Sequence, residues 1–195
     1  MKKRKVPDAF LQGSRLYLRS LIESDADGSY SSWFNDEEVC AGNSHHVRPY
    51  TREAALDYIR YARQTTDSLI LAIVLSDGDR HVGNIALGSI NRLYRTAEFS
   101  IVIGDKSIWG KGYSKEAAYL LCDHGFASMN LHRIGCGTFQ DNEPMKKLAT
   151  ALGMKEEGRR REAAFKHGGY VDIIEFGVLR NEYESLRGRS IKGKK

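Results

Sequence analysis

The sequence has few features that would indicate a metal site, a disulfide framework or a membrane segment. Its three cysteines, Cys40, Cys122 and Cys136, form no CxxC pair and lie in no His/Cys cluster with metal-ligand spacing. No apolar run approaches the roughly 18 residues that a membrane-spanning helix needs. The basic residues at the start are not followed by the apolar core of a signal peptide. These absences predict a cytoplasmic protein with no bound metal and no membrane partner.

The basic charge of the chain is concentrated at its two ends. The 195 residues carry a net charge of +5, and 41% of them are hydrophobic, which suits one well-buried domain. Four basic residues lie in 2–5 and five in 187–195, so that 21 basic residues face 25 acidic ones in between. We therefore expect a basic tail over 1–12, one domain over 13–184 and a second basic tail over 185–195. Short basic ends are usually solvated, so nucleic acid is not favoured as a partner, and an acidic body fits a substrate that arrives as an ammonium ion.

One stretch combines a strand, a glycine loop and a helix. An apolar strand over 97–104 leads to Gly110 and Gly112, and a helical run begins at Ser114. Glycines can adopt φ > 0 and carry no Cβ, so backbone N–H groups can close around an anion at the positive end of the helix dipole. The stretch has neither the P-loop pattern nor the Gly-x-Gly-x-x-Gly pattern of dinucleotide-binding proteins. It predicts a phosphate cradle of another kind.

The Gly-Lys-Gly-Tyr sequence at 110–113, followed by Lys-Glu-Ala at 115–117, resembles the acetyl-CoA loop of the GNAT superfamily of N-acetyltransferases. The resemblance is strongest to the RimJ/RimL-like branch, and it departs from the family pattern at Ser107, where Gln or Arg is usual. Further similar segments lie at 130–134, 141–142, 152–154, 157–158 and 169–172. The resemblance covers roughly 13–184 and implies acetyl-CoA as cosubstrate.

The order of expected elements agrees with that resemblance. Alternating or continuous apolar runs predict strands at 15–21, 68–75, 81–90, from Thr96 onward, and at 133–139, 155–166 and 170–180. Capping residues and helical spacing predict helices from Ser24 to about Asn35, after Thr51, over 114–128 and from Pro144 to Gly153. The resemblance implies a mixed α/β GNAT fold, with a mostly antiparallel sheet of about seven strands, a splayed parallel pair and four flanking helices.

Glu98 is the first candidate for the catalytic base. An amine with a pKa of about 10 must lose a proton before it attacks a thioester. Alternation places Glu98 on one face of the central strand with Ser100 and Val102, and a charged residue in an apolar strand needs water or a partner. A structural carboxylate paired with Arg92 or Arg95 is the open alternative.

The resemblance implies further roles for residues around the loop. Backbone N–H groups near Ile101, Val102 and Ile103 would bind the pantetheine amides and the thioester oxygen. The pyrophosphate would be held by Gly110, Lys111, Gly112, Tyr113 and Ser114, and the pantetheine arm by Asn142, which can equally cap a helix. The expected acceptor wall contributes Trp33, which also suits the core, and His45 and His46, which also suit an exposed loop.

No general acid can be named from the sequence. Ala149 stands where many family members have a tyrosine, and Met145 where some RimL-like members have a serine. Cys122 lies inside a helix and is poorly placed as a covalent nucleophile. We expect direct acetyl transfer to a primary amine, which would be a protein α-amine, a small amine or an amino sugar. The chain would act as a monomer or homodimer, and the alternative is a catalytically weak or inactive acyl-CoA-binding regulator.

Overall fold

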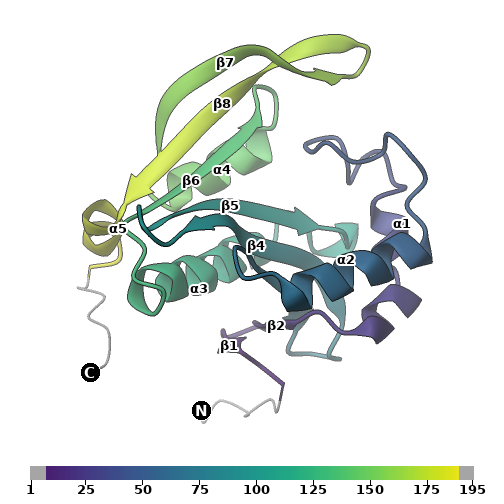
Figure 1. The fold of residues 1–195 in the computed structure, drawn as a ribbon. Coiled ribbons are helices and arrows are strands. Elements are labelled where there is room, and N and C mark those ends of the chain that lie inside the picture. Colours follow the sequence, from purple (N-terminus) through teal and green to yellow (C-terminus); the bar gives the residue numbers. More distant parts are fainter. Residues whose placement is uncertain (1–7, 189–195) are drawn as a thin grey trace.

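The computed structural model describes residues 8–188, which form one sheet with helices on both faces (Figure 1). The strand order is β1-β2-β3-β4-β5-β6-β8-β7. All neighbours are antiparallel except β5 and β6. The strands are β1 (Leu11–Gln12), β2 (Leu16–Ser20), β3 (Leu69–Leu75), β4 (His81–Asn91), β5 (Thr96–Ile103), β6 (Arg133–Phe139), β7 (Lys155–Lys166) and β8 (Gly169–Leu179).

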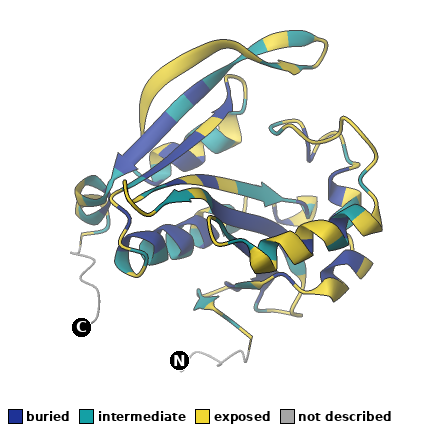
Figure 2. Ribbon diagram, in the orientation of Figure 1, coloured by how far each residue is buried: buried dark blue, intermediate teal, exposed yellow. Residues whose placement is uncertain are grey.

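Helices cover the two faces of the sheet and form two hydrophobic cores. The helices are α1 (Tyr30–Trp33), α2 (Arg52–Gln64), α3 (Tyr113–Ala127), α4 (Glu143–Ala151) and α5 (Arg180–Leu186), with 3₁₀ turns η1 (Glu23–Asp27) and η2 (Lys106–Ile108). Residues of α3, α4 and α5 join one core, and residues of η1, α1 and α2 join the other. Figure 2 shows that α2 and β7 expose much of their surface. Among the described residues, no helix is long and apolar enough to cross a bilayer.

The predicted mixed sheet with one parallel pair is confirmed, with differences at its margins. Eight strands replace the expected seven because β1 adds a two-residue strand, which is too short to leave a periodic signal. The helix expected from Ser24 is divided into η1 and α1, because Gly28 takes an extended conformation between them. The fifth helix, α5, was not predicted; Glu182 accepts the Leu179 N–H at its start. The basic tails at 1–7 and 189–195 lie outside the described residues.

The parallel pair is joined only at its beginning. Thr96–Glu98 of β5 pair with Arg133–Gly135 of β6, and beyond that point the two strands diverge (Figure 1). The β4–β5 register runs unbroken from Glu98 to Ile103, and its irregularity lies at the other end, between Gly88 and Asn91. The expected splaying of the parallel pair therefore occurs without a register shift in this part of the β4–β5 ladder. The divergence alone opens the space in which the candidate site lies.

Candidate functional site

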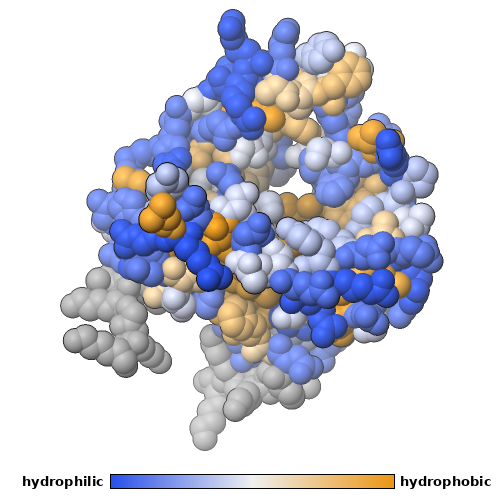
Figure 3. All heavy atoms as spheres, in the orientation of Figure 1, coloured by the Kyte–Doolittle hydropathy of each residue, from blue (hydrophilic) through white to orange (hydrophobic). Residues whose placement is uncertain are grey.

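A cleft of about 1470 Å³ lies where β5 and β6 diverge. Its walls come from β4, β5 and β6, from the loop before α3, from the start of α4, from the residues around 34–50 and from the tip of the β7–β8 hairpin. Figure 3 shows the molecule hollowed beneath that hairpin. Small-molecule sites usually occupy about 300–1,000 Å³, so this cleft has room for a cosubstrate and an acceptor together.

The glycine loop, which the sequence predicted to be a phosphate cradle, lies at one end of the cleft. Gly110 and Gly112 have φ values of 72° and 79°, and α3 begins immediately afterwards at Tyr113. A Cβ at Gly110 would meet no atom within 4 Å, so the backbone conformation and not space favours glycine there. Within the described chain, the N–H groups of Gly110, Gly112, Tyr113 and Ser114 donate to no acceptor. Four free donors at a helix N-terminus form a site for an anion such as a pyrophosphate.

The glycine loop is supported from the turn between β1 and β2 by an ion pair that the sequence did not reveal. Glu116 accepts hydrogen bonds from the backbone and hydroxyl of Ser14 and from the backbone and guanidinium of Arg15. Burial alone would raise the pKa of Glu116, but these donors hold that pKa below its usual range. Arg15 also donates to the Lys111 carbonyl at 2.9 Å and lies 4.3 Å from the Tyr113 ring centre. The Lys111 side chain itself does not line the cleft. Lys115 and Lys147 do, and they supply positive charge to the cleft wall.

The edge of β5 presents backbone groups to the cleft at alternate residues. The Val102 carbonyl lies against Gly83 of β4. In an antiparallel strand the backbone N–H and C=O of one residue point to the same neighbouring strand, and those of the next residue point away from it. Ile101 and Ile103 therefore face the side from which β6 has diverged. Trp109 Nε1 donates to the Ile103 carbonyl at 2.9 Å and so joins this edge to the glycine loop. Of the three predicted residues, Ile101 and Ile103 therefore direct their N–H groups toward the cleft, with no strand partner for them in the described sheet.

Asn142 performs two structural roles with its two amide atoms. Its Oδ1 accepts a hydrogen bond from the Met145 N–H at 3.2 Å and caps α4, which is the helix-capping role that the sequence left open. Its Nδ2 donates to the Gly42 carbonyl at 3.0 Å, so it also holds the loop on the opposite wall. Met145 lines the cleft and Ala149 is fully buried in the core, and neither carries a proton donor.

Glu98 is on the expected face of β5 but does not line the cleft. It is exposed, two residues before Ser100, which does line it. Partial burial and the neighbouring Glu175 raise the pKa of Glu98, while Arg133 and Arg160 oppose that shift. Both arginines are engaged elsewhere, with Glu157 and Glu175. Within the described residues Glu98 has no ion pair, and the expected partners Arg92 and Arg95 do not supply one.

The three residues predicted for the acceptor wall are separated by the structure. His45 lines the cleft, with its ring centre 4.3 Å from that of Phe34, and burial together with Lys166 lowers its pKa. His46 is exposed, has a φ of 67° and is outside the wall. Trp33 is buried behind the wall against Gly104, where any Cβ would overlap its ring. The three cysteines are buried and form no disulfide, none of them lines the cleft, and Cys122 lies inside α3.

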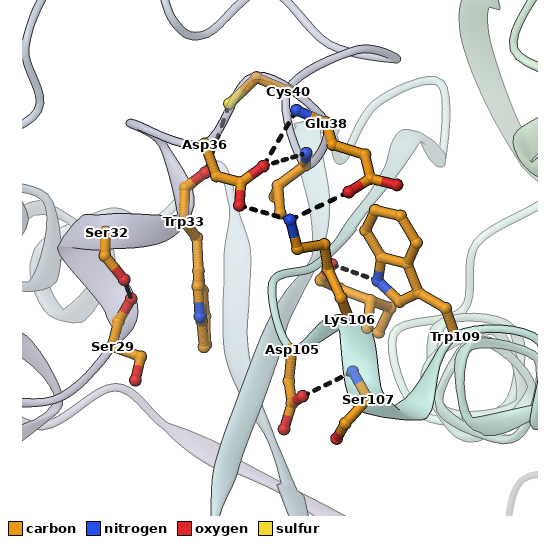
Figure 4. A network of polar contacts seen from close by, with 12 residues as sticks. Ser29, Ser32, Trp33, Asp36, Glu38, Cys40, Asp105, Lys106, Ser107 and Trp109 are labelled. Carbon is orange, nitrogen blue, oxygen red and sulfur yellow. Dashed lines mark hydrogen bonds and ion pairs between the residues drawn. The ribbon is translucent and has the colours of Figure 1, made fainter.

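A lysine joins the acceptor side of the cleft to the cofactor side. Lys106 in η2 donates to Asp36 Oδ2 at 2.7 Å and to Glu38 Oε2 at 2.9 Å (Figure 4). Asp105 Oδ1 accepts the Ser107 N–H at 2.9 Å and caps the same short turn. The loop after α1 and the loop before α3 therefore form one connected wall.

Comparison with known proteins agrees with this geometry. The family model described as "Acetyltransferase (GNAT) domain" matches residues 15–155. An uncharacterized N-acetyltransferase, p20 of Bacillus licheniformis, is 30% identical over 177 residues, which cover 89% of this chain and 97% of that protein. A spermidine N(1)-acetyltransferase of Vibrio cholerae is 29% identical over 124 residues, 63% of this chain and 71% of that one.

A solved structure shows the same fold. The spermidine N-acetyltransferase of Vibrio cholerae in complex with CoA and spermine superposes with a TM-score of 0.77 at 24% identity, over 88% of this chain and 99% of that one. At this identity the similarity establishes the fold alone. Among the described residues, no group of three or more His, Cys, Asp or Glu side chains could hold a metal ion.

Proposed function

This chain belongs to the GNAT family of N-acetyltransferases, and from that premise we propose that it transfers an acetyl group directly from acetyl-CoA to a primary amine, as a member of the RimJ/RimL-like branch. The observation that carries the proposal is the cradle of four free N–H donors at one end of a cleft whose other end is lined by the acceptor-side loop. The motifs at 110–117 and in the second half of the chain support the assignment to this branch.

The cosubstrate fits the residues that are present. Acetyl-CoA supplies an activated thioester, and the free N–H groups around Gly110 and Gly112 suit its pyrophosphate. Lys115 and Lys147 add positive charge to the same wall, with the Lys111 side chain outside it. We assign the pantetheine arm to the edge of β5 and to Asn142, which would exchange its bond to Gly42 for one to the arm.

Glu98 is the proposed base. It lies on the face of β5 that it shares with Ser100 and Val102, and its raised pKa makes its carboxylate a better proton acceptor than a glutamate with an ordinary pKa. Because it is behind Ser100 and not in the cleft wall, we propose that it takes the ammonium proton through one water molecule. The N–H groups of Ile101 and Ile103 would then stabilise the negative charge that develops on the thioester oxygen.

The acceptor class is proposed from the relatives and the cleft together. Proteins named spermidine N(1)-acetyltransferases are among the relatives, which supports a small amine over a protein α-amine or an amino sugar. His45 would contact the acceptor directly, and Trp33 would act by supporting Tyr30, whose ring centre is 5.6 Å away and which lines the cleft. A regulator that binds acyl-CoA without turning it over is the second candidate, because Ala149 and Met145 place no proton donor at the two positions where the family resemblance implied one.

The test is release of CoA from acetyl-CoA in the presence of a panel of amines, N-terminal peptides and amino sugars. We expect turnover with at least one acceptor, and a loss of kcat of about 100-fold or more in Glu98→Gln, which is the usual range for a general base. Unchanged activity in Glu98→Gln would remove the base assignment. Binding of acetyl-CoA with no turnover of any acceptor would establish the regulator instead.

A further inference from the structure

The acceptor end of the cleft is lined mainly by aromatic rings. Phe34 is central, with ring centres 4.3 Å from His45, 4.8 Å from Tyr50 and 5.6 Å from Tyr30. All four residues line the cleft, and the remaining apolar members of this end are Val39, Val47, Tyr58 and Ile70. Because their centres are only 4.3–5.6 Å apart, these rings pack directly on one another and leave no gap between them for a cation.

The charged side chains at this end are few and already engaged. Glu38 is the one carboxylate of the described acceptor end that lines the cleft, and it is paired with Lys106. Lys166, from the β7–β8 hairpin, donates to the Asn43 carbonyl at 3.0 Å and adds positive charge near His45. The other charged lining residues come from α3, from α4 and from the residue before its cap, on the wall opposite the loop that contains Gly42: Lys115, Asp141, Glu143 and Lys147.

This local charge differs from the acidic balance of the body of the chain. A polyamine brings further ammonium groups, and each needs a carboxylate or water when it enters a cleft. Here the acceptor end offers it aromatic rings, a paired glutamate and a lysine. An amine with one positive charge brings no further ammonium group, and its apolar body is removed from water against Val47, Tyr50 and Tyr58, which have surface free for contact.

We propose that the acceptor is a primary monoamine with an aromatic or similarly sized apolar body, and that polyamines are poor substrates. The proposal rests on the proposed function, since it concerns the same cleft. Under this proposal the chain differs in acceptor from its relatives that are named spermidine N(1)-acetyltransferases.

The first experiment compares three amines in the CoA-release assay with the full-length protein. 2-Phenylethylamine and propylamine carry one charge each and differ in the ring, and spermidine supplies additional charges. We expect kcat/KM for 2-phenylethylamine to exceed that for each of the other two amines by about tenfold or more, which is the discrimination that contacts in an apolar pocket commonly provide. A higher kcat/KM for spermidine would overturn the inference while leaving the proposed function intact. Failure of all three amines, alongside turnover of a peptide or an amino sugar, would overturn the inference as well.

The second experiment changes the charge of the acceptor end. Val47 lines the cleft and is 83% exposed, so Val47→Glu adds a carboxylate there without disturbing the core. Leu93→Glu is the matched control, because Leu93 is 82% exposed and lies outside the cleft wall. We expect Val47→Glu to raise the ratio of spermidine to 2-phenylethylamine kcat/KM about tenfold. An unchanged ratio in Val47→Glu, or an equal shift in Leu93→Glu, would contradict the proposal.

Discussion

Two tyrosines, Tyr30 and Tyr183, are equally buried but differ in what their hydroxyls contact. Tyr183 is 0% exposed and donates to Asp123 Oδ1 at 2.9 Å. Tyr30 is 1% exposed, and its hydroxyl has no hydrogen-bond partner in the described chain. Burial raises the pKa of both phenols, so both remain protonated at neutral pH. A buried hydroxyl without a partner costs free energy, whereas one that is bonded to a carboxylate stabilises the fold.

Conversion of each tyrosine to phenylalanine tests this difference. Tyr183→Phe should lower the free energy of unfolding by about 1.5–3 kcal/mol, because it removes a hydrogen bond to a charged group. Tyr30→Phe should be neutral or stabilising, since it removes a donor that nothing satisfies. Urea denaturation of the two variants measures both values. Equal destabilisation by the two substitutions would show that the Tyr30 hydroxyl has a partner.

The raised pKa of Glu98 predicts the pH dependence of activity. The carboxylate must be deprotonated to accept a proton, so kcat/KM should fall at acid pH with an apparent pKa above the 4.5 of an ordinary glutamate. A carboxyl whose folded-state pKa is raised destabilises the fold at pH values above that pKa. Glu98→Gln should therefore lose the acid limb of the activity profile without loss of stability at neutral pH. An acid limb that persists in the variant would assign that limb to another group.

At the scale of elements, Asn142 couples the start of α4 to the loop on the opposite wall. It caps α4 through Met145 and holds the Gly42 carbonyl, whereas Thr51 caps α2 through Ala54 and lies outside the cleft wall. Loss of a cap costs about 0.5–2 kcal/mol at either site. The two caps therefore allow the effect on stability to be separated from an effect on binding.

We predict that Asn142→Ala and Thr51→Ala lower the free energy of unfolding by similar amounts, about 1 kcal/mol each. Only Asn142→Ala should also weaken binding of acetyl-CoA, because only that side chain is proposed to contact the pantetheine arm. Denaturation and calorimetric titration of both variants give the two readouts. Equal affinities in the two variants would reduce Asn142 to its capping role.

At the scale of the molecule, the periodic parts of the chain were predictable and the contacts between loops were not. The strand at 133–139 has the predicted bounds and the helix after Thr51 begins where predicted, because apolar periodicity and a capping residue are local signals. The pairing of β6 beside β5 followed from the helical connection between them. Gly28, which divides η1 from α1, was read as part of a helix because its extended conformation depends on the surrounding packing.

The unpredicted parts of the site join residues that are distant in sequence. Arg15 and Glu116 are 101 residues apart, and Asn142 and Gly42 are 100 apart. Pattern and spacing carry no information about such pairs, since the fold alone brings them together. The glycine loop was recognised because its chemistry is contained in one short segment. The separation of His45 from Trp33 and His46 could not be predicted, since these three residues lie in and before an irregular loop.

The central claim is that the glycine cradle binds acetyl-CoA, and calorimetric titration of the full-length protein tests it most directly. The Gly110→Ala/Gly112→Ala variant forces two L-residues into the left-handed region, at about 1–2 kcal/mol each. Gly78→Ala/Gly168→Ala imposes the same conformational cost at φ values of 74° and 80°, in turns where a Cβ would meet nothing within 4 Å.

We predict that the wild type binds acetyl-CoA with micromolar affinity. The Gly110→Ala/Gly112→Ala variant should bind more weakly by about tenfold or more, which equals about 1.4 kcal/mol. The Gly78→Ala/Gly168→Ala control should bind with nearly the wild-type affinity. An equal loss in both variants would indicate a general effect of strain. A folded wild type that does not bind acetyl-CoA would contradict the account.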